Sequence, residues 1–402
     1  MKYGRSSHSL GVLGQPFVAA RNRVCQSGDV PVVAAAAYSR ALGAHFAHAR
    51  DHRDVGAQLV TRHIAVLPGD LAGQEVIPEA VKVLKACSLG YEFEDFEVGA
   101  APLLHGEPAM SEETFQQASR ADAILFGAIG DPRVADVGYP AQVLLRIRFE
   151  LDLYVNLRPA RLHDDRLSPL RDPDRRPIDL LIVRENTEGL YVGMGGRFKR
   201  GTEQEVAVQE DVNTYQGVSR IIEYGFTRAK RRLCMVDKSN AIGHAGGLWQ
   251  ERWKAIKARH AGIEARHLYV DAAAMELVRD PTQFEVIVTG NLFGDILSDL
   301  TATLIGGMGL APSANINPDS GRGLFEPVHG SAPNIAGQGI VNPLGAILSA
   351  GMMVEHLGDE DAAKRIEQAV VGAIRSGEST RDLGGSLTTS EAGDAVVKRL
   401  RD

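Results

Sequence analysis

Short apolar runs alternate with stretches of helical periodicity along the chain from residue 62 onward. The first run covers residues 64–67, and apolar residues then recur at intervals of three and four between positions 76 and 84, as on one helix face. Further strands are expected at residues 123–126, 180–183, 205–209, 233–236, 268–270 and 286–288, and long helices at 343–357 and 362–374. This alternation predicts an α/β fold.

The predicted strand at residues 205–209 has a different pattern from its neighbours. Val206 and Val208 lie on one face and Glu205, Ala207 and Gln209 on the other, whereas the other strands are apolar throughout. Such alternation indicates an antiparallel edge or a subunit contact. We infer a large lobe from residues 61–153 and 308–402, with a smaller lobe, residues 154–307, inserted in it. A cleft between lobes is the expected ligand site.

Charge and composition exclude several classes of protein. The 402 residues carry 44 Lys and Arg against 51 Asp and Glu, with no block of like charges, which argues against a nucleic-acid partner. No apolar run approaches the roughly 18 residues of a membrane span, so no membrane partner is expected. The three cysteines, Cys25, Cys87 and Cys234, lack the spacing of a zinc site or a disulfide framework, which favours a cytoplasmic setting.

Residues 1–60 differ in character from the rest, with seven basic residues against three acidic ones and weak periodicity. Three interpretations stay open: a disordered extension or a start codon assigned too early, a targeting peptide, and a folded appendage. A secretory signal is disfavoured because no apolar core directly follows the basic start. We leave this segment out of the fold prediction.

Three carboxylates stand at the ends of predicted strands. Asp295 and Asp299 are one helical turn apart at the start of a helix, so their oxygens can converge on one cation. By itself such a pair is more typical of a solvated face. Their position at a strand-to-helix junction, where α/β proteins bind ligands, and a third acid, Asp271, after another apolar run favour a metal site. Without histidine or cysteine nearby, the expected ion is Mg²⁺ or Mn²⁺.

Basic residues gather in the same part of the chain. Arg146, Arg148, Arg158 and Arg184 lie within 39 positions, and Arg184 directly ends an apolar strand. Any one of them could serve in a structural ion pair, but together they are typical of a receptor for a dicarboxylic acid.

Two further residues are candidates for proton transfer. Lys238 ends an apolar strand, and Tyr191 follows Arg184 by seven residues. A divalent metal beside the lysine, and a cation beside the phenol, can lower their pKa values. A surface lysine and a core tyrosine are the plainer interpretations.

A loop rich in small residues precedes the helix at 343–357. Its backbone N–H groups can approach phosphates, although it is not a G-x-G-x-x-G motif. A dinucleotide site here is therefore not of the standard Rossmann type. The loop contains His329, Gly330, Ser331, Ala332, Asn334 and Asn342.

Several motifs together resemble the β-decarboxylating dehydrogenases, the family of 3-isopropylmalate, isocitrate, homoisocitrate and tartrate/D-malate dehydrogenases. The motifs are Asn-Leu-Arg-Pro-Ala at 156–160, Val-Arg-Glu-Asn-Thr-Glu-Gly at 183–189, Asp-Lys-Ser-Asn at 237–240, the segment 289–299, and Phe-Glu-Pro-Val-His-Gly-Ser-Ala-Pro at 325–333. They occur in family order and spacing, over about residues 62 to 400.

This resemblance implies a two-lobed, isopropylmalate-dehydrogenase-like, non-Rossmann fold with a large cofactor-binding lobe. The small lobe would carry the dimer interface and the metal and substrate residues. It also implies a homodimer with shared active sites, NAD, Mg²⁺ or Mn²⁺, and K⁺ as a candidate further cation. The substrate residues would be Arg148, Arg158, Arg184, Leu144 and Leu145. The cofactor residues would be Glu326, His329, Gly330, Ser331, Ala332, Asn334 and Asn342.

The same resemblance implies roles in the reaction. Asp295 and Asp299 would hold the metal with Asp271 of the partner subunit. The partner's Lys238 would accept the hydroxyl proton as hydride leaves C2 for the nicotinamide. The metal would polarise the new ketone for loss of CO₂, and Tyr191 would help protonate the resulting enolate.

Two positions depart from the family pattern. Asn334 stands where NAD-preferring members have Asp and bacterial NADP-dependent isocitrate dehydrogenases have Lys, so NAD is favoured over NADP. Leu71 stands where the family has Gly in the loop 69–73, and it would reshape this loop if the position needs a positive φ.

The choice of substrate rests on few residues. The helix before Arg148 lacks the Ser and Asn with which isocitrate enzymes meet a third carboxylate, so isocitrate is disfavoured. Leu144 and Leu145 are compatible with both isopropylmalate and tartrate/D-malate enzymes, but segments 184–189 and 195–210 look most like the tartrate/D-malate branch. Ala241, where isopropylmalate enzymes often carry Val, leaves the pocket open to a different group.

Tartrate/D-malate is therefore the expected substrate class. The alternative is 3-isopropylmalate, as in leucine biosynthesis, or a related 3-substituted malate. A non-catalytic regulatory subunit is the rival from another class, because heteromeric relatives include such chains.

Overall fold

The computed structural model describes residues 61–136 and 138–401, so the predictions for residues 1–60 lie outside the described chain. Its strands are β1 (Arg62–Gly69), β2 (Tyr91–Asp95), β3 (Ala123–Ala128), β4 (Val155–Arg161), β5 (Asp179–Glu185), β6 (Gly195–Phe198), β7 (Val206–Gln209), β8 (Arg232–Asp237), β9 (Glu264–Tyr269), β10 (Val286–Thr289), β11 (Pro312–Asn317) and β12 (Arg322–Pro327). The helices are α2 (Ala72–Ala86), α3 (Ala100–Leu104), α4 (Glu112–Ala118), α5 (Arg146–Glu150), α6 (Tyr215–Arg228), α7 (Gly243–Lys257), α8 (Val270–Arg279), α9 (Asn291–Leu304), α10 (Leu344–His356), α11 (Glu360–Arg375) and α12 (Thr389–Arg401). A π-helical turn, Ala141–Leu145, leads directly into α5.

One ten-stranded sheet runs through this part of the chain, in the order β2-β1-β3-β12-β11-β4-β5-β10-β8-β9. The four strands at one end are parallel to one another, and so are β5, β10, β8 and β9 at the other. The strands between them, β11 and β4, join the two halves through antiparallel pairs. This arrangement confirms the α/β prediction. One half-sheet comes from residues 61–153 and 308–402 and the other from 154–307, while the division into two lobes stays a prediction.

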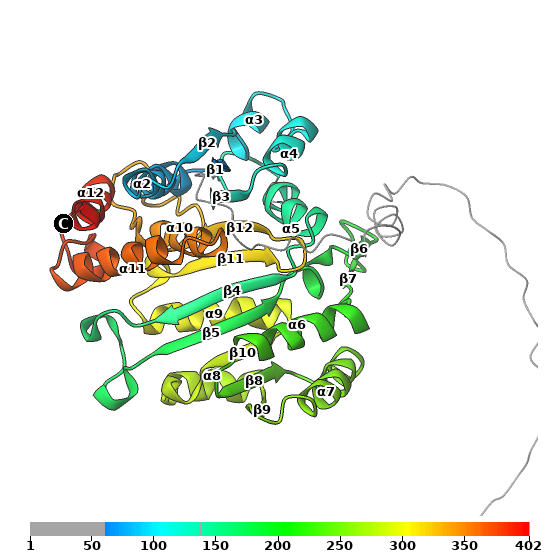
Figure 1. Cartoon of the computed structure of the whole chain (residues 1–402). Helices are drawn as coiled ribbons and strands as arrows, with labels where there is room; N and C mark the ends of the chain where they lie inside the picture. The colour runs from blue at the N-terminus through cyan, green and yellow to red at the C-terminus, as the bar shows by residue number, and fades with distance from the viewer. Residues whose placement is uncertain (1–60, 137, 402) are drawn as a thin grey trace, which may run out of the picture. The chain divides into compact units, whose positions relative to one another are not determined.

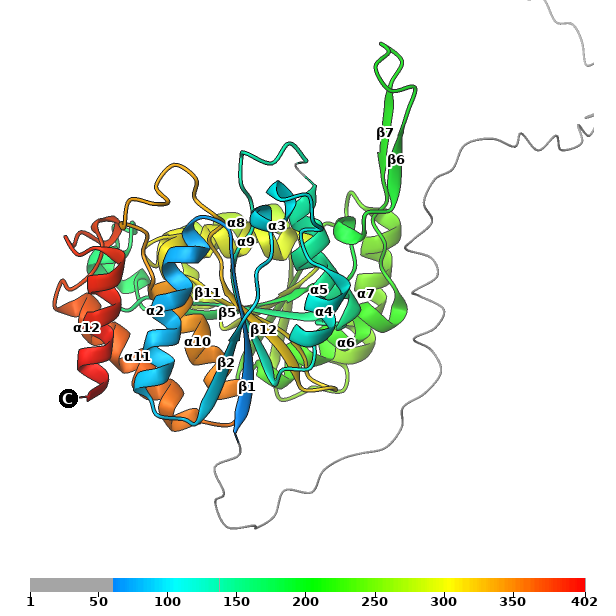
Figure 2. The same cartoon turned by 90° about the horizontal axis from the view of Figure 1, so that it is seen from above.

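Helices cover both faces of the sheet, which explains why strands such as β1, β3 and β10 are apolar on both of their faces. In β1, Ile64 and Val66 point into the core shared with α2 and α10, whereas Ala65 and Leu67 point into a second core on the other face. Helices α2, α6, α7, α10, α11 and α12 contribute to the first core. Helices α3 to α5, and also α8 and α9, pack on the opposite face (Figures 1 and 2).

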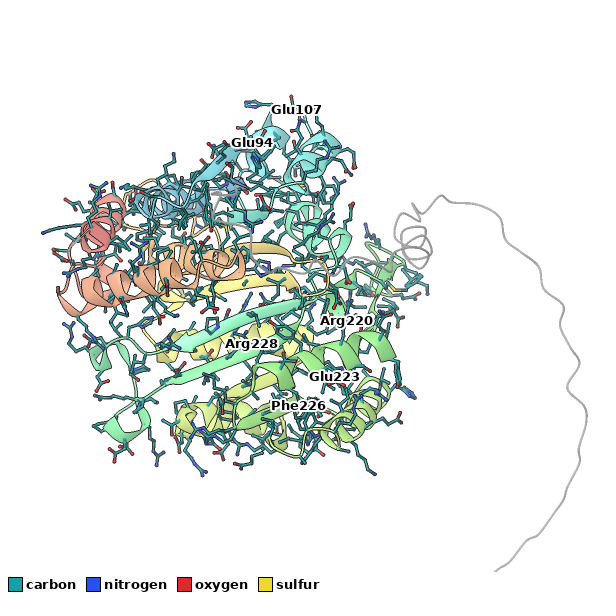
Figure 3. All side chains as sticks on the ribbon, viewed as in Figure 1. Glu94, Glu107, Arg220, Glu223, Phe226 and Arg228 are labelled. Carbon is teal, nitrogen blue, oxygen red and sulfur yellow. The ribbon has the colours of Figure 1, made fainter. Side chains whose placement is uncertain are left out.

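Helix α6 illustrates how the amphipathic pattern becomes packing. Thr214 caps its N-terminus by accepting a hydrogen bond from the backbone N–H of Gly217. Phe226 is buried and stacks on Trp253 of α7, with 5.4 Å between ring centroids, while Arg228 is exposed at the last turn. Figure 3 labels Phe226 and Arg228 along this helix. The buried face of α6 therefore supports β5 and β10, the strands that lead to the candidate site.

Most of the predicted elements are confirmed, with two corrections of position. The helices predicted at 343–357 and 362–374 are α10 and α11, and the apolar runs at 64–67, 123–126, 180–183, 233–236 and 286–288 are strands. The strand predicted at 268–270 is wrong in position, because β9 ends at Tyr269 and Val270 already begins α8. The strand predicted at 205–209 begins one residue later, at Val206.

Strands β2, β4, β6, β11 and β12 were not predicted. The edge strand β2 has the sequence Tyr-Glu-Phe-Glu-Asp and is largely exposed, so it lacks an apolar run. The strands β4 and β11 carry Asn156, Arg158 and Asn315 at buried positions, which breaks their hydrophobic pattern. Because buried polar residues interrupt the apolar pattern of β4 and β11, these central strands could not be recognised from the sequence.

Strands β6 and β7 form a separate antiparallel hairpin, which extends away from the main sheet in Figure 2. This confirms the antiparallel edge expected for residues 205–209. Phe198, Val206 and Val208 are exposed on it, with 59%, 51% and 40% of their surface accessible. Within residues 61–136 and 138–401, no helix is long and apolar enough to cross a membrane.

Candidate active site

The candidate residues lie where parallel strands end. Arg184 is the penultimate residue of β5, and Lys238 directly follows β8. Asp295 lies in α9, which follows β10, and Asp271 lies in the first turn of α8, which follows β9. Because β5, β10, β8 and β9 are parallel neighbours, these residues share one edge of the sheet, the usual ligand edge of an α/β protein.

Two buried arginines converge on the acids of α9. Nη1 of Arg184 donates a hydrogen bond to Oδ1 of Asp295 at 2.5 Å, and Nη1 of Arg158 donates to the same oxygen at 3.1 Å. The Arg158 guanidinium also lies 3.6 Å from Oδ1 of Asp299. Arg184 is 1% exposed and Arg158 is 7% exposed. The structure therefore brings the predicted Arg158, Arg184, Asp295 and Asp299 together.

The local sequence explains this close packing. Gly294 lies against Arg184, and a Cβ at this position would come within 2.5 Å of the arginine side chain. Asn291, at the start of α9, accepts hydrogen bonds from both Nε and Nη2 of Arg184 and donates one to the carbonyl of Glu188. The amide of Asn291 thus orients Arg184, and Gly294 leaves space for its side chain. The sequence analysis singled out neither residue.

Burial and mutual charge shift the pKa values of this cluster. Burial, reinforced by Arg158, lowers the pKa of Arg184 to about 9, and burial also lowers the pKa of Arg158. Burial alone would raise the pKa of Asp295, but Arg184 and Arg158 hold it below its ordinary value. Burial raises the pKa of Asp299 despite Arg158. Two guanidiniums packed this tightly favour the binding of further negative charge.

Tyr191 also belongs to this cluster. Its hydroxyl donates to Oδ2 of Asp295 at 2.8 Å, and the Arg184 guanidinium lies 5.4 Å from the centre of its ring. Burial and the Asp295 charge raise the pKa of Tyr191 above its ordinary value, although Arg184 opposes the shift. The prediction that a cationic neighbour lowers this pKa is therefore wrong, because the carboxylate accepts a hydrogen bond from the neutral phenol and disfavours its ionisation.

Arg148 is bound to a different carboxylate. It is 5% exposed, and its Nη2 donates to Oε1 of Glu326 at 2.7 Å. The neighbouring Arg146 instead pairs with Glu112 and Glu150 at the surface and belongs to a structural ion-pair group. Of the four arginines that the sequence singled out, Arg148, Arg158 and Arg184 are therefore buried near the candidate site.

The apolar pair expected at the substrate lies just before Arg148. Leu144 and Leu145 close the π-helical turn, and both are half-buried. Leu144 packs partly against the core between β1, β3 and α5, whereas Leu145 belongs to no core cluster of the described residues. Such turns are frequent at functional sites.

Lys238 and Asp271 form a second, separate group. Nζ of Lys238 donates to Oδ1 of Asp271 at 2.5 Å, and Asp271 keeps 62% of its side chain exposed. Asp295 and Asp299 both lie within reach of one Arg158 nitrogen, so their oxygens converge and suit a hard cation such as Mg²⁺ or Mn²⁺. Within residues 61–136 and 138–401, however, no three potential ligands meet at one point. The three predicted ligands are thus not assembled within one chain.

The predicted cofactor loop spans residues 328–343, between β12 and α10. The backbone N–H of Ala72 donates to the carbonyl of Ser331 at 3.0 Å and so ties the loop to the start of α2. Asn334 and Gly330 are exposed. Nε2 of His329 is buried and has no hydrogen-bond partner in the described chain. A buried polar atom is costly to leave unpaired, so an exposed loop with one unpartnered imidazole nitrogen fits a bound polar group such as a dinucleotide.

Two other residues of this region have structural surroundings. Asn342 is 4% exposed, donates to Oδ2 of Asp382 and accepts from the N–H of Leu344 at the start of α10. Leu71 has φ +49° and ψ −110°, so the position does require the backbone conformation that glycine adopts freely. Ala332, in the cofactor loop that is tied to the start of α2, also has a positive φ, at 44°.

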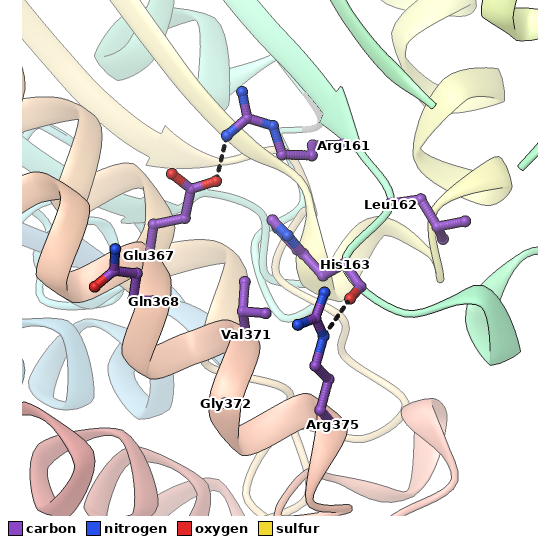
Figure 4. A pocket seen from close by; sticks show the side chains of 8 residues that line it. All are labelled: Arg161, Leu162, His163, Glu367, Gln368, Val371, Gly372 and Arg375. Atoms are coloured by element: carbon purple, nitrogen blue, oxygen red, sulfur yellow. Dashed lines mark hydrogen bonds and ion pairs between the residues drawn. The ribbon is translucent and has the colours of Figure 1, made fainter. Parts of the chain in front are cut away.

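A cavity of about 430 Å³ lies on the opposite edge of the sheet (Figure 4). It is lined by the end of β4 and by α11, and Arg161 at its rim is paired with Asp179 and Glu367. Because Asp179 begins β5 and Arg184 is its penultimate residue, this cavity is separated from the candidate site by nearly the length of the strand.

Comparisons with known proteins agree with these motifs. A family model described as isocitrate/isopropylmalate dehydrogenase matches residues 63–396. The chain belongs to the isocitrate/isopropylmalate dehydrogenase family. The expectation of a β-decarboxylating dehydrogenase is thereby confirmed.

Relatives within this family refine the picture. The chain is 43% identical over 351 residues to 3-isopropylmalate dehydrogenase of Thermobifida fusca, covering 85% of this chain and 98% of that protein. It is 45% identical over 343 residues to the enzyme of the same name from Corynebacterium jeikeium, covering 84% and 99%. A crystal structure of isocitrate dehydrogenase from Methylococcus capsulatus matches with a TM-score of 0.79 at 38% identity, covering 85% of this chain and 100% of that chain. The names of the sequence relatives favour the isopropylmalate alternative over tartrate/D-malate.

Proposed function

We propose that this chain catalyses the NAD- and divalent-metal-dependent oxidative decarboxylation of 3-isopropylmalate or a closely related 3-substituted malate. The observation that carries the proposal is the cluster of Arg148, Arg158 and Arg184, all buried at the ligand edge beside the acids of α9. Within one chain these guanidiniums pair with Glu326 and Asp295, and a divalent cation held by Asp295 and Asp299 would leave them with uncompensated positive charge. A dicarboxylate supplies that compensation.

The alkyl part of the substrate is assigned to the apolar pair before Arg148. Leu145 lies three residues, about one helical turn, from Arg148 on a continuous helical segment, and it packs into no core cluster of the described residues. An apolar surface next to a carboxylate-binding arginine suits a malate that carries a branched alkyl group. The relatives named 3-isopropylmalate dehydrogenase support the same substrate.

Each polar residue then has a role. Arg148, Arg158 and Arg184 bind and orient the two carboxylates. Lys238 accepts the proton of the substrate hydroxyl. Tyr191 donates a proton to the carbon from which CO₂ has left, and its raised pKa keeps the phenol protonated at neutral pH. A cation on Asp295 and Asp299 would supply Lewis-acid polarisation of the substrate oxygens, and NAD would accept the hydride.

NAD is proposed over NADP because of Asn334. Its side chain is exposed on the cofactor loop, and it carries no positive charge for a 2′-phosphate. The loop residues His329, Gly330, Ser331 and Ala332 would line the same site together with Glu326, while the buried amide of Asn342 would support the loop.

A homodimer with shared sites is also part of the proposal. Within one chain Lys238 pairs with Asp271, away from the acids of α9, and α8 and α9 expose apolar side chains next to these residues. The exposed side chains are Met275 at 67%, Val278 at 50% and Ile296 at 57%. A second copy that covers this surface would bring its own Asp271 and Lys238 toward Asp295. The apolar residues of the β6–β7 hairpin suit the same interface.

The proposal is tested by initial rates with Mn²⁺ and either NAD or NADP, with release of CO₂ recorded in parallel. The substrates are 3-isopropylmalate, D-malate, the tartrates and isocitrate. We expect the highest kcat/KM with 3-isopropylmalate and NAD. A preference for D-malate or tartrate would return the chain to that branch, and a folded, metal-loaded protein that turns over none of them would overturn the proposal.

A further inference from the structure

The Arg148 guanidinium is hydrogen-bonded to the carboxylate of Glu326, and this carboxylate is in turn hydrogen-bonded to the amide of Asn315. Oε1 of Glu326 accepts from Arg148 at 2.7 Å and also from Nδ2 of Asn315 at 2.8 Å. All three residues are at most 5% exposed. The second oxygen of Glu326 has no protein partner among the described residues. The rotamer of Glu326, and with it the position of Arg148, therefore depends on a single buried amide.

The orientation of the Asn315 amide is fixed by its other partners. Its Oδ1 accepts from Nδ2 of Asn186 at 2.9 Å and from Nδ2 of Asn156 at 3.1 Å. Two donors on one side require an oxygen there, so the NH₂ group must face Glu326. Replacing Asn315 by aspartate would therefore remove the N–H donor to Glu326.

These side chains form one hydrogen-bonded row across neighbouring strands. Glu326 is on β12, Asn315 on β11 and Asn156 on β4, and Asn186 directly follows β5. In the register of the sheet, Asn156 pairs with both Asn315 and Arg184. The row thus connects the strand that carries Glu326 to the strands that carry Arg158 and Arg184, across the antiparallel centre of the sheet.

We propose that Asn315 is a positioning residue for substrate binding, acting through Glu326 to hold the Arg148 guanidinium in its carboxylate-binding place. The inference rests on the proposed role of Arg148. Asn315 lies behind Glu326 and touches no reacting atom, so its effect is on substrate affinity. Lys238, Tyr191, Asp295 and Asp299 make no hydrogen bond to the row, so the chemical step keeps its rate at saturation.

Asn317 provides a matched control on the same strand. It lies two residues further along β11, is 7% exposed, and uses its amide to donate to the carbonyl of Asp152 and to accept from a turn. It is a buried, satisfied asparagine like Asn315 but has no connection to Glu326. Its replacement reports the cost of losing a buried amide at this depth.

The experiment compares Asn315→Leu, Asn315→Asp and Asn317→Leu by steady-state kinetics with 3-isopropylmalate at saturating NAD and Mn²⁺, and by thermal unfolding. Asn315→Leu leaves Asn156 and Asn186 with other acceptors, so folding is retained. We expect both Asn315 variants to raise KM roughly tenfold, which corresponds to about 1.4 kcal/mol, with kcat nearly unchanged. Asn317→Leu should lower Tm about as much as Asn315→Leu does, but it should leave KM unchanged.

Two outcomes overturn the inference. One is a lowered Tm with unchanged KM in both Asn315 variants, which would make Asn315 purely structural. The other is a crystal structure of Asn315→Leu in which Glu326 and Arg148 keep their positions. The structural measurement does not depend on turnover, so it decides the inference even if no malate is a substrate. If the wild-type chain turns over none of the tested malates, the proposed function is contradicted. A displaced Arg148 in the crystal structure of Asn315→Leu would still support the positioning role of Asn315.

Discussion

Lys238 and Asp271 form an ion pair, with 2.5 Å between Nζ and Oδ1. The pair lies in a solvent-accessible position, and neither residue contacts the Arg158–Arg184–Asp295 cluster of the same chain. In the proposed homodimer, this pair and the arginine cluster of the other copy would be the two halves of one reaction site. This separation motivates the first two predictions.

Replacing Lys238 by Met should lower kcat by roughly 10² to 10⁴, the range for loss of a general acid or base. Substrate affinity should change little, because the arginine cluster is untouched. Stopped-flow measurement of NADH formation, with circular dichroism to confirm folding, checks this result. Lys364→Met, on the exposed face of α11, is the control and should keep full activity. Unchanged turnover in Lys238→Met would remove this lysine from the mechanism.

Mixing two inactive variants should restore activity if the sites are shared. Asp295→Asn removes a hard oxygen ligand and should weaken Mn²⁺ binding, measured by calorimetry. When Lys238→Met and Asp295→Asn are unfolded together and refolded, random pairing makes half of the dimers mixed, and one site in each mixed dimer is intact. About a quarter of wild-type activity should return. If every site lies within one chain, the mixture stays as inactive as its components.

Leu71 stores backbone strain at the start of α2. Its φ of +49° with ψ −110° is a conformation that costs a residue with a side chain about 1–3 kcal/mol. Leu71→Gly should relieve this strain. The greater conformational entropy of glycine in the unfolded chain offsets part of the gain, so we expect the unfolding free energy to rise by about 1 kcal/mol. Urea denaturation measures it. Leu89→Gly, at a partly buried leucine without positive φ, should destabilise instead, and equal losses in both variants would show that Leu71 is unstrained.

Glu185 should make stability fall as pH rises through neutrality. Burial, followed by the charge of Glu188, raises the pKa of Glu185 from 4.5 to about 7, although the N–H groups of Thr187 and Glu188 oppose the shift. The folded state binds the proton more tightly than the unfolded state, so the stabilisation is complete below pH 4.5 and is lost as pH rises through about 7.

The size of this loss is on the order of 3 kcal/mol for a fully buried carboxyl. Glu185→Gln keeps the shape and removes the charge, so its stability between pH 5 and 8 should decline less than that of the wild type. Denaturant titrations at several pH values measure the difference. Parallel pH profiles for the two proteins would show that Glu185 is not the titrating group.

The sequence by itself determined the α/β class, the positions of the apolar strands and of three long helices, and the residues gathered at the candidate site. Apolar runs and helical periodicity report burial along one segment at a time, and strand ends mark the ligand edge without further information. The motifs around Arg158, Arg184, Lys238 and Asp295 were therefore accessible, as was the conformational demand at Leu71, which the structure confirms with a positive φ.

Only the tertiary structure decided which of these groups meet. It raised the pKa of Tyr191 by burying the phenol and by placing Asp295 against its hydroxyl, and it separated Lys238 and Asp271 from the acids of α9. It also joined Asn315 to Glu326 across strands that the sequence left unpredicted. The physical reason is that hydrogen bonds and electrostatic shifts depend on distances between segments far apart in the chain, and a local pattern of polar and apolar residues carries no such distances.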